Sequence, residues 1–427
     1  MVKSRICIHV GQCGNQIAQN FWDSILQEHA DALGDEKENK FRFDGALCSM
    51  FTNLDNGSLL PIGSDVKRLR ARALLVDMEE RVLDHTKRSV IGPLFDSSQR
   101  LSDFSGSGNN WAFAFSVYGS RHGERIADMI QSELEKCDFC DSFLMFHSTG
   151  GGTGSGLGSH ILRSLSDIAP KTTRIVTSVF PSGEADVVTS PYNTILAMRY
   201  LKEYSHLVIP SDNSALASFP SPKITRTHSS FDNMNYWIAM LMKDLTAPIR
   251  FDSPISQSFQ STARDLVRQR DLNYAIPSLA PLKPPSSDLH AQSKSFDLMF
   301  SELLRKQNCL LSVDIRKGTS LGCHKVVRYG TENLNDIIRN IHRNGLKNQT
   351  TIYDSVSVAK SVISPSIASL VNSTSIIPLI KRSITNFTTL YKRRANVHHY
   401  LDHIGCGDFD EALESAKSQL CSYGIMN

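Results

Sequence analysis

The sequence predicts an α/β protein built on a doubly wound, mainly parallel β-sheet, followed by a mixed α+β region and a helical C-terminus. Three observations predict this class. The first half alternates short apolar runs with helical patterns, a glycine-rich segment stands between one such run and a helix, and the pattern changes after residue 210. Strands separated by helices form parallel sheets, which bind ligands at the carboxyl ends of their strands. We therefore expect the functional residues of the first half in the loops that follow the strands.

The strands and helices of the first half are predicted from apolar periodicity. The run "RICIHV" (5–10) leads into a helical pattern in which Ile17, Phe21 and Ile25 share one face. Further β-rich runs are "ARALLVD" (71–77), "AFAFSVYG" (112–119), "SFLMFHS" (142–148), "RIVTSVF" (174–180) and "SHLVIP" (205–210). Helical patterns occupy residues 121–136, 156–168 and 191–204. This alternation is typical of a doubly wound sheet.

The second half begins with "FDNMNYWIAMLMKDLTA" (231–247), a strongly apolar helix that we expect to run through the middle of the protein. Residues 250–371 mix strands and helices, and the prolines of "PSLAPLKPPSS" (277–287) argue against regular structure there. Two helices are predicted near the C-terminus, at 376–397 and 408–422. A chain of 427 residues suits two or three domains. We expect a first domain at 1–213, a core helix with an intermediate domain at 214–371, and a C-terminal helical region at 372–427.

Composition narrows the classes of protein. The formal net charge of +3 is too close to balance to indicate nucleic acid or an anionic membrane as the main partner. No run of 18 apolar residues occurs, so no membrane insertion is expected, and the N-terminus does not have the apolar core of a secretory signal. Nine cysteines at irregular spacings read as reduced thiols. These features predict an intracellular, cytoplasmic protein.

The stretch "HSTGGGTGSGLG" (147–158) joins a predicted strand to a predicted helix. A bare backbone at such a place lets N–H groups approach an anion, and the helix N-terminus favours negative charge. The common phosphate motifs do not fit: there is no Gly-Lys-Ser/Thr of a Walker loop, no register for G-x-G-x-x-G, and no G-x-S-x-G elbow around Ser155. The sequence therefore predicts a phosphate-binding loop of another type.

"GGGTGSG" (150–156) resembles the phosphate-loop signature of the tubulin family. Further stretches similar to that family follow in its order: "GQCGNQI" (11–17), "RALLVDMEE" (72–80), "SGSGNNWA" (105–112), "SPYN" (190–193) and "DN" (212–213). The resemblance extends to "NSTSIIPLIKRSITNFTTLYKRRANVHHYL" (372–401), which is similar to the penultimate helix of tubulins. The chain is thus identified as a member of this family, with GTP and Mg²⁺ as the implied ligands.

Departures from the α and β patterns indicate a divergent subfamily. "DMEE" (77–80) replaces the usual Leu-Glu-Pro after the aspartate, "PSGEADVVTSPYN" (181–193) replaces a Glu-Pro-Tyr-Asn ending, and the acidic tail is absent. These features resemble ε-tubulin, with δ-tubulin as the alternative. The resemblance implies a structural protein of the cytoskeleton that supports microtubule and centriole or basal-body assembly, located at the centrosome, centriole or basal body. The implied partners are α/β- and δ-tubulin and centriolar or basal-body proteins.

The resemblance also implies a GTP site, residue by residue. Two loops would contact the α and β phosphates, a third would sense the γ-phosphate, and two acidic residues would hold Mg²⁺ or its waters. In the same order these are Gly11, Gln12 and Cys13; Gly150, Gly151, Gly152, Thr153 and Gly154; Gly108 and Asn109; and Asp77 and Glu79. Cys13 is expected to pack beside the nucleotide and not to act as a catalytic thiol.

The remaining implied contacts concern the nucleoside. Asp186 and Asn193 would face the ribose, and Asn213 would hydrogen-bond the guanine. Phe231 and Asn235 are four residues apart on one helical face, so one can stack on the purine while the other bonds its edge. Phe231 stands where the major tubulins carry a tyrosine. Phenylalanine keeps the stacking surface and lacks the hydroxyl.

Two departures concern affinity and hydrolysis. Ser190 stands where the major tubulins carry a glutamate that binds the ribose. In the loop that reaches the next subunit's nucleotide, the family's Asn, Asp and Glu positions fall on Ser256, Ser258 and Ser261. No carboxylate therefore stands where the attacking water would be polarised, unless the alignment slips by a helical turn to Asp265. We assign no catalytic residue and expect GTP binding with weak or absent hydrolysis in trans.

Other classes of function remain as alternatives. A free-standing GTPase is disfavoured by the missing carboxylates, and a dinucleotide-dependent oxidoreductase is disfavoured by the missing G-x-G-x-x-G. A non-polymerising centriolar adaptor that only kept the fold is the third possibility. The nucleotide carried by the purified protein separates these alternatives.

Overall fold

The computed structural model describes residues 3–34, 47–54, 69–182, 187–221, 230–251, 253, 257–282, 296–329, 354–360 and 365–426. The first half contains β1 (Lys3–Val10), α1 (Gly11–Gly34), β2 (Phe51–Asn53), β3 (Leu69–Ala71), β4 (Ala73–Val76), α2 (Glu80–Arg88), β5 (Arg100–Leu101), α3 (Trp111–Phe113), η5 (Ala114–Tyr118), α4 (Gly119–Glu135), β6 (Phe139–Ser148), η6 (Thr153–Leu157), α5 (Gly158–Ile168), β7 (Thr173–Phe180), α6 (Ser190–Tyr204), β8 (Leu207–Asp212) and α7 (Asn213–Leu216). The second half contains α8 (Ser230–Arg250), α9 (Phe259–Leu266), β9 (Ile276–Ala280), α10 (Phe296–Leu303), β10 (Ser320–Tyr329), β11 (Asp354–Lys360), β12 (Ser366–Ser373), α12 (Ile377–Lys392), α13 (His398–Leu401) and α14 (Cys406–Ile425).

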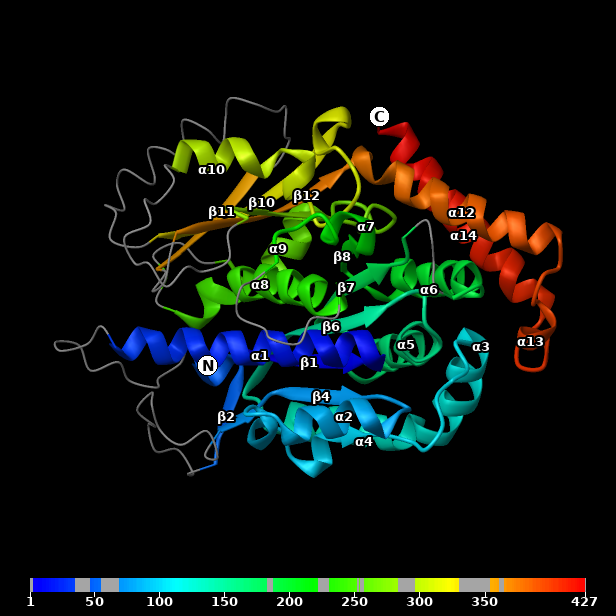
Figure 1. The fold of residues 1–427 in the computed structure, drawn as a ribbon, viewed down its shortest axis with the longest axis horizontal. Coiled ribbons are helices and arrows are strands. Elements are labelled where there is room, and N and C mark those ends of the chain that lie inside the picture. The colour runs from blue at the N-terminus through cyan, green and yellow to red at the C-terminus, as the bar shows by residue number, and fades with distance from the viewer. Residues whose placement is uncertain are drawn as a thin grey trace.

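A six-stranded sheet of order β5-β4-β1-β6-β7-β8 forms the centre of the first half. All its pairings are parallel. Strands such as β7 are buried along their whole length, because helices cover both faces of a parallel sheet. In Figure 1 the strands point to the same side of the molecule, where α3 and α13 face one another. The predicted α/β fold class is confirmed, and the loops at this edge are those that the sequence analysis singled out.

The prediction of a strand at residues 112–119 was wrong. The segment is helical, as α3 followed by the π-helical turn η5. The reason lies just before it, where the Oδ1 of Asn110 accepts hydrogen bonds from the backbone N–H groups of Ala112 (2.8 Å) and Phe113 (3.2 Å). An N-cap of this kind starts a helix whatever the β-propensity of the aromatic residues that follow.

A second sheet, of order β11-β10-β12-β9, combines one parallel and two antiparallel pairings. The expectation that 277–287 lacks regular structure was wrong at its start, because Pro277 lies within β9. This strand is at the edge of the sheet, where a missing N–H breaks no ladder. Residues 283–287 of the same stretch lie outside the described part of the chain.

Helix α8 lies between the two sheets (Figure 1) and packs on α1 on one side and on the second sheet on the other. Trp237, Ile238, Leu241 and Leu245 are among its buried residues. A helix that is apolar around most of its circumference is stable only in such a position. The predicted core helix is thereby confirmed.

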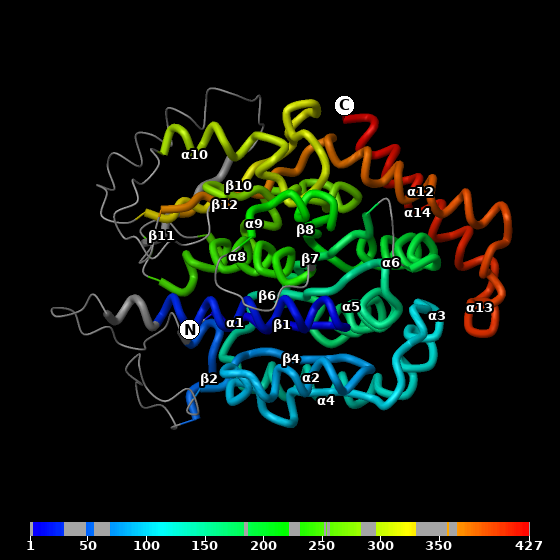
Figure 2. The backbone as a smooth tube through the Cα atoms, viewed as in Figure 1, coloured from blue at the N-terminus to red at the C-terminus, as the bar shows by residue number. Residues whose placement is uncertain are grey.

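The C-terminal helices α12 and α14 run side by side across one face of the molecule, with α13 at their turn (Figure 2). The first of them ends at Lys392, five residues earlier than the predicted bound of 397. Arg394 and Asn396 have φ angles of 51° and 58°. Two left-handed residues so close together end a helix, and the chain then turns into α13.

A cluster of buried charges joins α1, α8 and β10. The Nη2 of Arg250 lies 2.7 Å from the Oε2 of Glu28, and Arg328 pairs with the other oxygen of Glu28 and, at 2.9 Å, with Asp244. Lys243 approaches Glu28 to 3.9 Å. Burial alone would raise the pKa of the Glu28 carboxyl, but the charges of Arg328, Arg250 and Lys243 hold it below its ordinary value. The cluster therefore stays ionised inside the protein.

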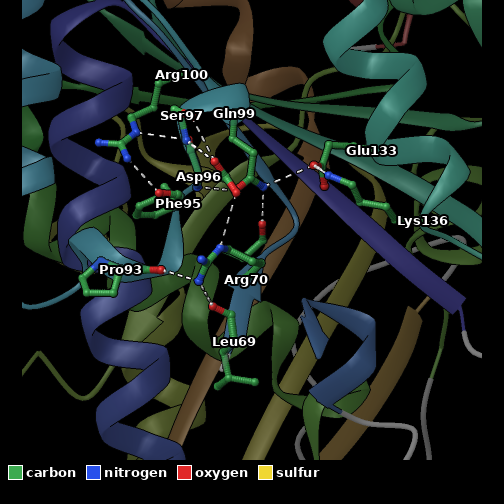
Figure 3. Close-up of polar contacts among 11 residues, drawn as sticks. Leu69, Arg70, Pro93, Phe95, Asp96, Ser97, Gln99, Arg100, Glu133 and Lys136 are labelled. Atoms are coloured by element: carbon green, nitrogen blue, oxygen red, sulfur yellow. Dashed lines mark hydrogen bonds and ion pairs between the residues drawn. The ribbon is translucent and has the colours of Figure 1, made fainter. Parts of the chain in front are cut away.

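The corner before β5 is held by side chains that bond the backbone (Figure 3). The Nη1 of Arg70 donates to the carbonyl of Pro93 (2.8 Å), and the Oε1 of Gln99 accepts from the N–H of Asp96 (2.8 Å). The Nε2 of Gln99 in turn donates to the carbonyl of Ala71 (2.7 Å). These contacts fix the short edge strand, and with it the start of the loop at residues 102–110.

In the part of the chain that the structure describes, no helix combines the length and the apolarity that a membrane crossing requires.

Among the residues that the structure describes, four histidines are buried in the neutral form: His9, His29, His147 and His324. Burial lowers the pKa of His9 and His29 from 6.5 to about 3, with the charge of Arg250 adding to the effect at His29, and lowers the pKa of His147 and His324 to about 4. Below pH 6.5 the unfolded chain therefore binds more protons than the folded one. The stability is complete above about pH 6.5 and falls as the pH drops toward 4.

Each of these histidines is expected to add up to about 1.4 kcal/mol per pH unit to the rate at which the free energy of unfolding falls with falling pH. Urea unfolding at a series of pH values between 7 and 4.5 measures the slope. His147→Gln should show a shallower slope than the wild type, whereas His85→Gln, which changes a histidine on the exposed face of α2, should not. Equal slopes for wild type and His147→Gln would contradict the prediction.

Candidate functional site

The first loop and the glycine-rich loop meet at the carboxyl edge of the six-stranded sheet. Gly11 has a φ of 72°, and a Cβ there would lie 2.9 Å from the backbone nitrogen of Gly154. Nearby, the Nδ2 of Asn15 donates to the carbonyls of Gly11 (2.9 Å) and Val76 (3.1 Å). The turn after β1 thus requires glycine, and Asn15 joins it to the end of β4.

The glycine-rich loop leaves β6 and enters the π-helical turn η6. His147, fully buried, has its Nδ1 2.9 Å from the carbonyl of Gly154 and its Nε2 2.8 Å from the Oγ of Ser178. Because the carbonyl can only accept, the proton is on Nδ1. The Oγ of Ser155 donates to the carbonyl of Gly152 (3.2 Å) and also contacts that of Gly151. These bonds turn the loop so that helix α5 starts behind it, a geometry suited to anions.

The third loop carries Gly108 and Asn109, both left-handed, with φ of 58° and 54°. Its Ser107 Oγ lies 3.1 Å from the Oγ1 of Thr153. A Cβ on Gly152 would come within 2.5 Å of the backbone nitrogen of Asn110 and would also meet Ser107. The predicted γ-phosphate loop and the glycine-rich loop are therefore in direct backbone contact.

Asp77 follows β4 and is buried, while Glu79 is exposed. The Oδ1 of Asp77 accepts from the backbone N–H groups of Met78 (2.8 Å) and Glu79 (3.4 Å), and its Oδ2 is buried without a hydrogen-bond partner among the described residues. Burial raises the pKa of the Asp77 carboxyl to about 7, and the charge of Glu79 adds to this rise. A Cβ on Gly106 would lie 2.6 Å from the Oε1 of Glu79, so that carboxylate lies against the third loop. A buried, unpartnered carboxylate oxygen beside a second carboxylate fits the oxygen ligands that Mg²⁺ prefers.

Asn193, on α6, is fully buried. Its Nδ2 donates to the carbonyls of Asn109 (2.8 Å) and Gly150 (2.9 Å), and its Oδ1 accepts from the N–H of Trp111 (2.9 Å) and the hydroxyl of Tyr400 (2.6 Å). The amide thus makes all four hydrogen bonds of which it is capable with protein atoms. That leaves none for a ribose, so the contacts of Asn193 support a role in holding the loops in place of the predicted one.

The base side is less closely tied to the loops. Phe231 is 44% exposed at the start of α8. One turn further on, the Nδ2 of Asn235 donates a 3.2 Å hydrogen bond to the Oε1 of Gln16 on α1. Asn213 opens α7 at the end of β8. The carboxylate of its neighbour Asp212 caps α7 and forms an ion pair with Arg382 at 3.2 Å. An exposed aromatic ring at a helix start is available for stacking on a base.

The other predicted residues are placed as follows. Gln12 and Cys13 were expected on a loop but lie in the first turn of α1, where Gln12 is exposed and Cys13 is half-buried. Burial raises the pKa of the Cys13 thiol to about 12, which keeps it protonated. Ser190 is buried and its Oγ donates to the carbonyl of Gly150 (3.2 Å). Asp186 lies outside the described residues.

A serine of the loop before α9 caps that helix. Ser258 is the N-cap of the helix, and its Oγ accepts from the N–H of Ser261 at 3.1 Å. Ser256 lies outside the described residues. Asp265 is half-buried near the end of α9. The serines thus serve the local helix, and Asp265 stands two turns further along.

Sequence reasoning missed several residues that build the site. Ser107 and Asn110 belong to the quoted motif 105–112 but were not singled out, although their spacing from the glycines carried the signal. Thr189, whose Oγ1 donates to the carbonyl of Asn109 (3.0 Å), and Tyr400 come from distant segments. No local pattern marks Tyr400, because it is 207 residues away from its partner Asn193 along the chain.

The fold and these loops define a class: an α/β protein that binds a phosphate-bearing nucleotide at the carboxyl edge of a parallel sheet. The family model described as "Tubulin/FtsZ family, GTPase domain" matches residues 4–220. The chain belongs to the tubulin family, and its first half is the GTP-binding domain of that family. The predicted family is confirmed.

Relatives along the whole chain refine this result. The chain is 35% identical to the tubulin epsilon chain of Mus musculus, over 99% of this chain and 96% of that protein. It is also 35% identical to the tubulin epsilon chain of Homo sapiens, over 98% and 95%. Identity to the tubulin beta-1 chain of Homo sapiens is 27%, over 97% and 92%. The protein is therefore similar to epsilon tubulins, as the sequence motifs indicated.

Proposed function

We propose that this chain is a structural GTP-binding subunit that supports the assembly of centrioles or basal bodies together with other tubulins, with weak or absent stimulation of GTP hydrolysis. The observation that carries GTP binding is the direct contact of the three loops around Gly11, Asn109 and Gly152 at one edge of the sheet. The similarity to epsilon tubulins supports the centriolar part and a location on the cytoskeleton. The implied partners are α/β- and δ-tubulin and proteins of the centriole or basal body.

The nucleotide contacts follow from the loops. Backbone N–H groups of the first loop and of Gly150–Gly154 would surround the α and β phosphates, and Gly108 and Asn109 would meet the γ-phosphate. Asn213 and Asn235 would bond the guanine, and Phe231 would stack on it. Asp77 and Glu79 would hold Mg²⁺, which supplies charge neutralisation at the phosphates when bound.

Weak hydrolysis in trans rests on the loop before α9. The hydroxyl of Ser258 caps that helix, and a hydroxyl cannot take a proton from water as a carboxylate can. The alternative is that Asp265 polarises the attacking water. This requires Asp265 to reach the next subunit's nucleotide from near the end of α9.

The first experiment identifies the nucleotide that the purified protein carries, by extraction and ion-exchange chromatography. Mostly GTP supports a site that binds without turnover. Mostly GDP contradicts the proposed loss of hydrolysis. No guanine nucleotide, together with no binding of added GTP, contradicts the proposed function and favours an adaptor.

Hydrolysis in trans is then measured as phosphate release on mixing with other tubulins. We expect no increase over the sum of the separate proteins. Steady release that Asp265→Ala abolishes, and that Asp128→Ala on the exposed face of α4 does not, would show that Asp265 is the active carboxylate.

The Mg²⁺ site is tested by GTP affinity with and without the ion. Mg²⁺ should tighten binding by about tenfold or more in the wild type, and Asp77→Asn should lose most of that gain. Glu80→Gln, which changes the exposed neighbour of Glu79, should retain it. Equal Mg²⁺ dependence in Asp77→Asn and wild type would remove Asp77 from the site.

A further inference from the structure

One side chain holds two phosphate loops together. The Nδ2 of Asn193 bonds the backbone of Asn109 in the third loop and of Gly150 in the glycine-rich loop, at 2.8 and 2.9 Å. Its Oδ1 accepts from the N–H of Trp111 at 2.9 Å. The position of the third loop relative to the glycine-rich loop therefore depends on the orientation of this amide.

The fourth bond to this amide comes from the C-terminal region. Tyr400, on α13, is fully buried, and its hydroxyl donates to the Oδ1 of Asn193 at 2.6 Å. Burial raises the pKa of the Tyr400 hydroxyl above its ordinary value, so it remains a donor. A second hydrogen bond joins the third loop directly to α13, from the Nδ2 of Asn110 to the carbonyl of His399 (2.7 Å). Helix α13 is thus bonded both to the third loop and to the amide that orients it.

The third loop is held in a conformation that it would rarely adopt alone. Asn109 is left-handed, and its carbonyl is fixed from α6 and from Thr189 at 3.0 Å. The loop also lines a cavity of about 610 Å³, whose lining residues include Gly108 of the loop and His399 and Asp402 of the α13 region. The loop therefore has room to move away from the glycine-rich loop unless the bonds to Asn193 and α13 hold it.

We propose that Tyr400 and Asn193 are positioning residues for the γ-phosphate, through which α13 sets the preference of the site for GTP over GDP. Loss of the Tyr400 bond lets the amide turn and the third loop shift into the cavity, which weakens contacts to the γ-phosphate more than contacts to the α and β phosphates. By reciprocity, a protein that displaces α13 lowers the preference for GTP, and GTP opposes that displacement. The inference rests on the proposed GTP binding.

Tyr400→Phe removes only the hydroxyl, and the affinities for GTP and GDP are measured by titration of the nucleotide-free protein in Mg²⁺. We expect GTP binding to weaken by about fivefold while GDP binding changes by less than about twofold. The matched control is Tyr423→Phe. That tyrosine is also buried in a C-terminal helix, and its hydroxyl accepts from the N–H of Tyr274 at 3.0 Å, away from the loops. It should leave the ratio of the two affinities unchanged.

Asn193→Asp provides a second variant, because it keeps an acceptor for Tyr400 and loses both donations to the loops. It should lower the ratio further than Tyr400→Phe. In hydrogen exchange, GTP should protect residues 106–110 and 396–402 together in the wild type, and only the first segment in Tyr400→Phe.

The outcomes separate the inference from the function on which it rests. If the wild type binds GTP and Tyr400→Phe weakens GTP and GDP equally, or neither, the inference is overturned and the GTP site stands. If GTP protects 396–402 equally in both proteins, the inference is also overturned. A wild type that binds no guanine nucleotide overturns the proposed function itself.

Discussion

Glu28→Gln is expected to lower the free energy of unfolding by about 3–5 kcal/mol. The substitution keeps the shape of the side chain and removes the negative charge that faces Arg250 and Arg328. Both arginines are about 1% exposed, so neither can recover its lost partner from water. Asp244 remains, but its other oxygen already accepts from the hydroxyl of Ser366 at 2.8 Å. Arg250 and Arg328 would then both lose a buried carboxylate that they contact in the native protein.

Equilibrium unfolding in guanidinium chloride measures this effect. The matched control is Glu414→Gln, which removes one member of an ion pair with Lys417 whose side chains are 70% and 49% exposed. A surface pair of this kind contributes at most about 1 kcal/mol. Similar losses in the two variants would show that the cluster is not acting as a buried ionic network.

Gly152→Ala is expected to weaken GTP binding by up to about 100-fold, because a Cβ there meets the backbone of the third loop. The nearest backbone atom, the nitrogen of Asn110, would lie at 2.5 Å, so the two loops must separate. Relieving such overpacking costs about 3 kcal/mol, which corresponds to about two powers of ten in affinity. Fluorescence titration with a GTP analogue, at temperatures where the variant remains folded, measures it.

Gly424→Ala on α14 is the matched control, since a Cβ there meets no atom within 4 Å. Its GTP affinity should equal that of the wild type, and its unfolding temperature should not be lower. Wild-type GTP affinity in Gly152→Ala would mean that the contact between the loops is not needed for binding.

Much of the fold could be predicted because parallel strands and a buried helix leave strong patterns. Strands β1, β6, β7 and β8 each contain a short run rich in apolar residues, and α8 is rich in buried apolar residues. The wrong strand at 112–119 shows the limit of such patterns. Alternating aromatic residues favour a strand. Here the segment is a helix, because Asn110, a polar residue outside the run, caps its N-terminus.

The site was predictable where two motifs follow neighbouring strands of one parallel sheet, and not where contacts from distant segments decide. The loops of Gly11 and Gly152 were expected to meet, because they follow strands of one parallel sheet. The saturation of Asn193 could not be foreseen, since its partners come from segments before and after it, and the last of them lies on α13. A side chain's remaining hydrogen-bond capacity is known only once all neighbours are placed.

The apolar interior has a consequence for how the chain can be divided. One continuous cluster contains Ile6 of β1, Val371 of β12 and Tyr423 of α14, and a second contains Ile17 of α1 together with Leu370 of β12. The residues matched by the GTPase family model therefore share both interiors with the C-terminal half. A fragment cut after α7 would expose the surfaces on which α8 and the second sheet pack, and it would lack autonomy as a folding unit. The GTP-binding domain and the C-terminal half are therefore expected to unfold together, as one cooperative unit.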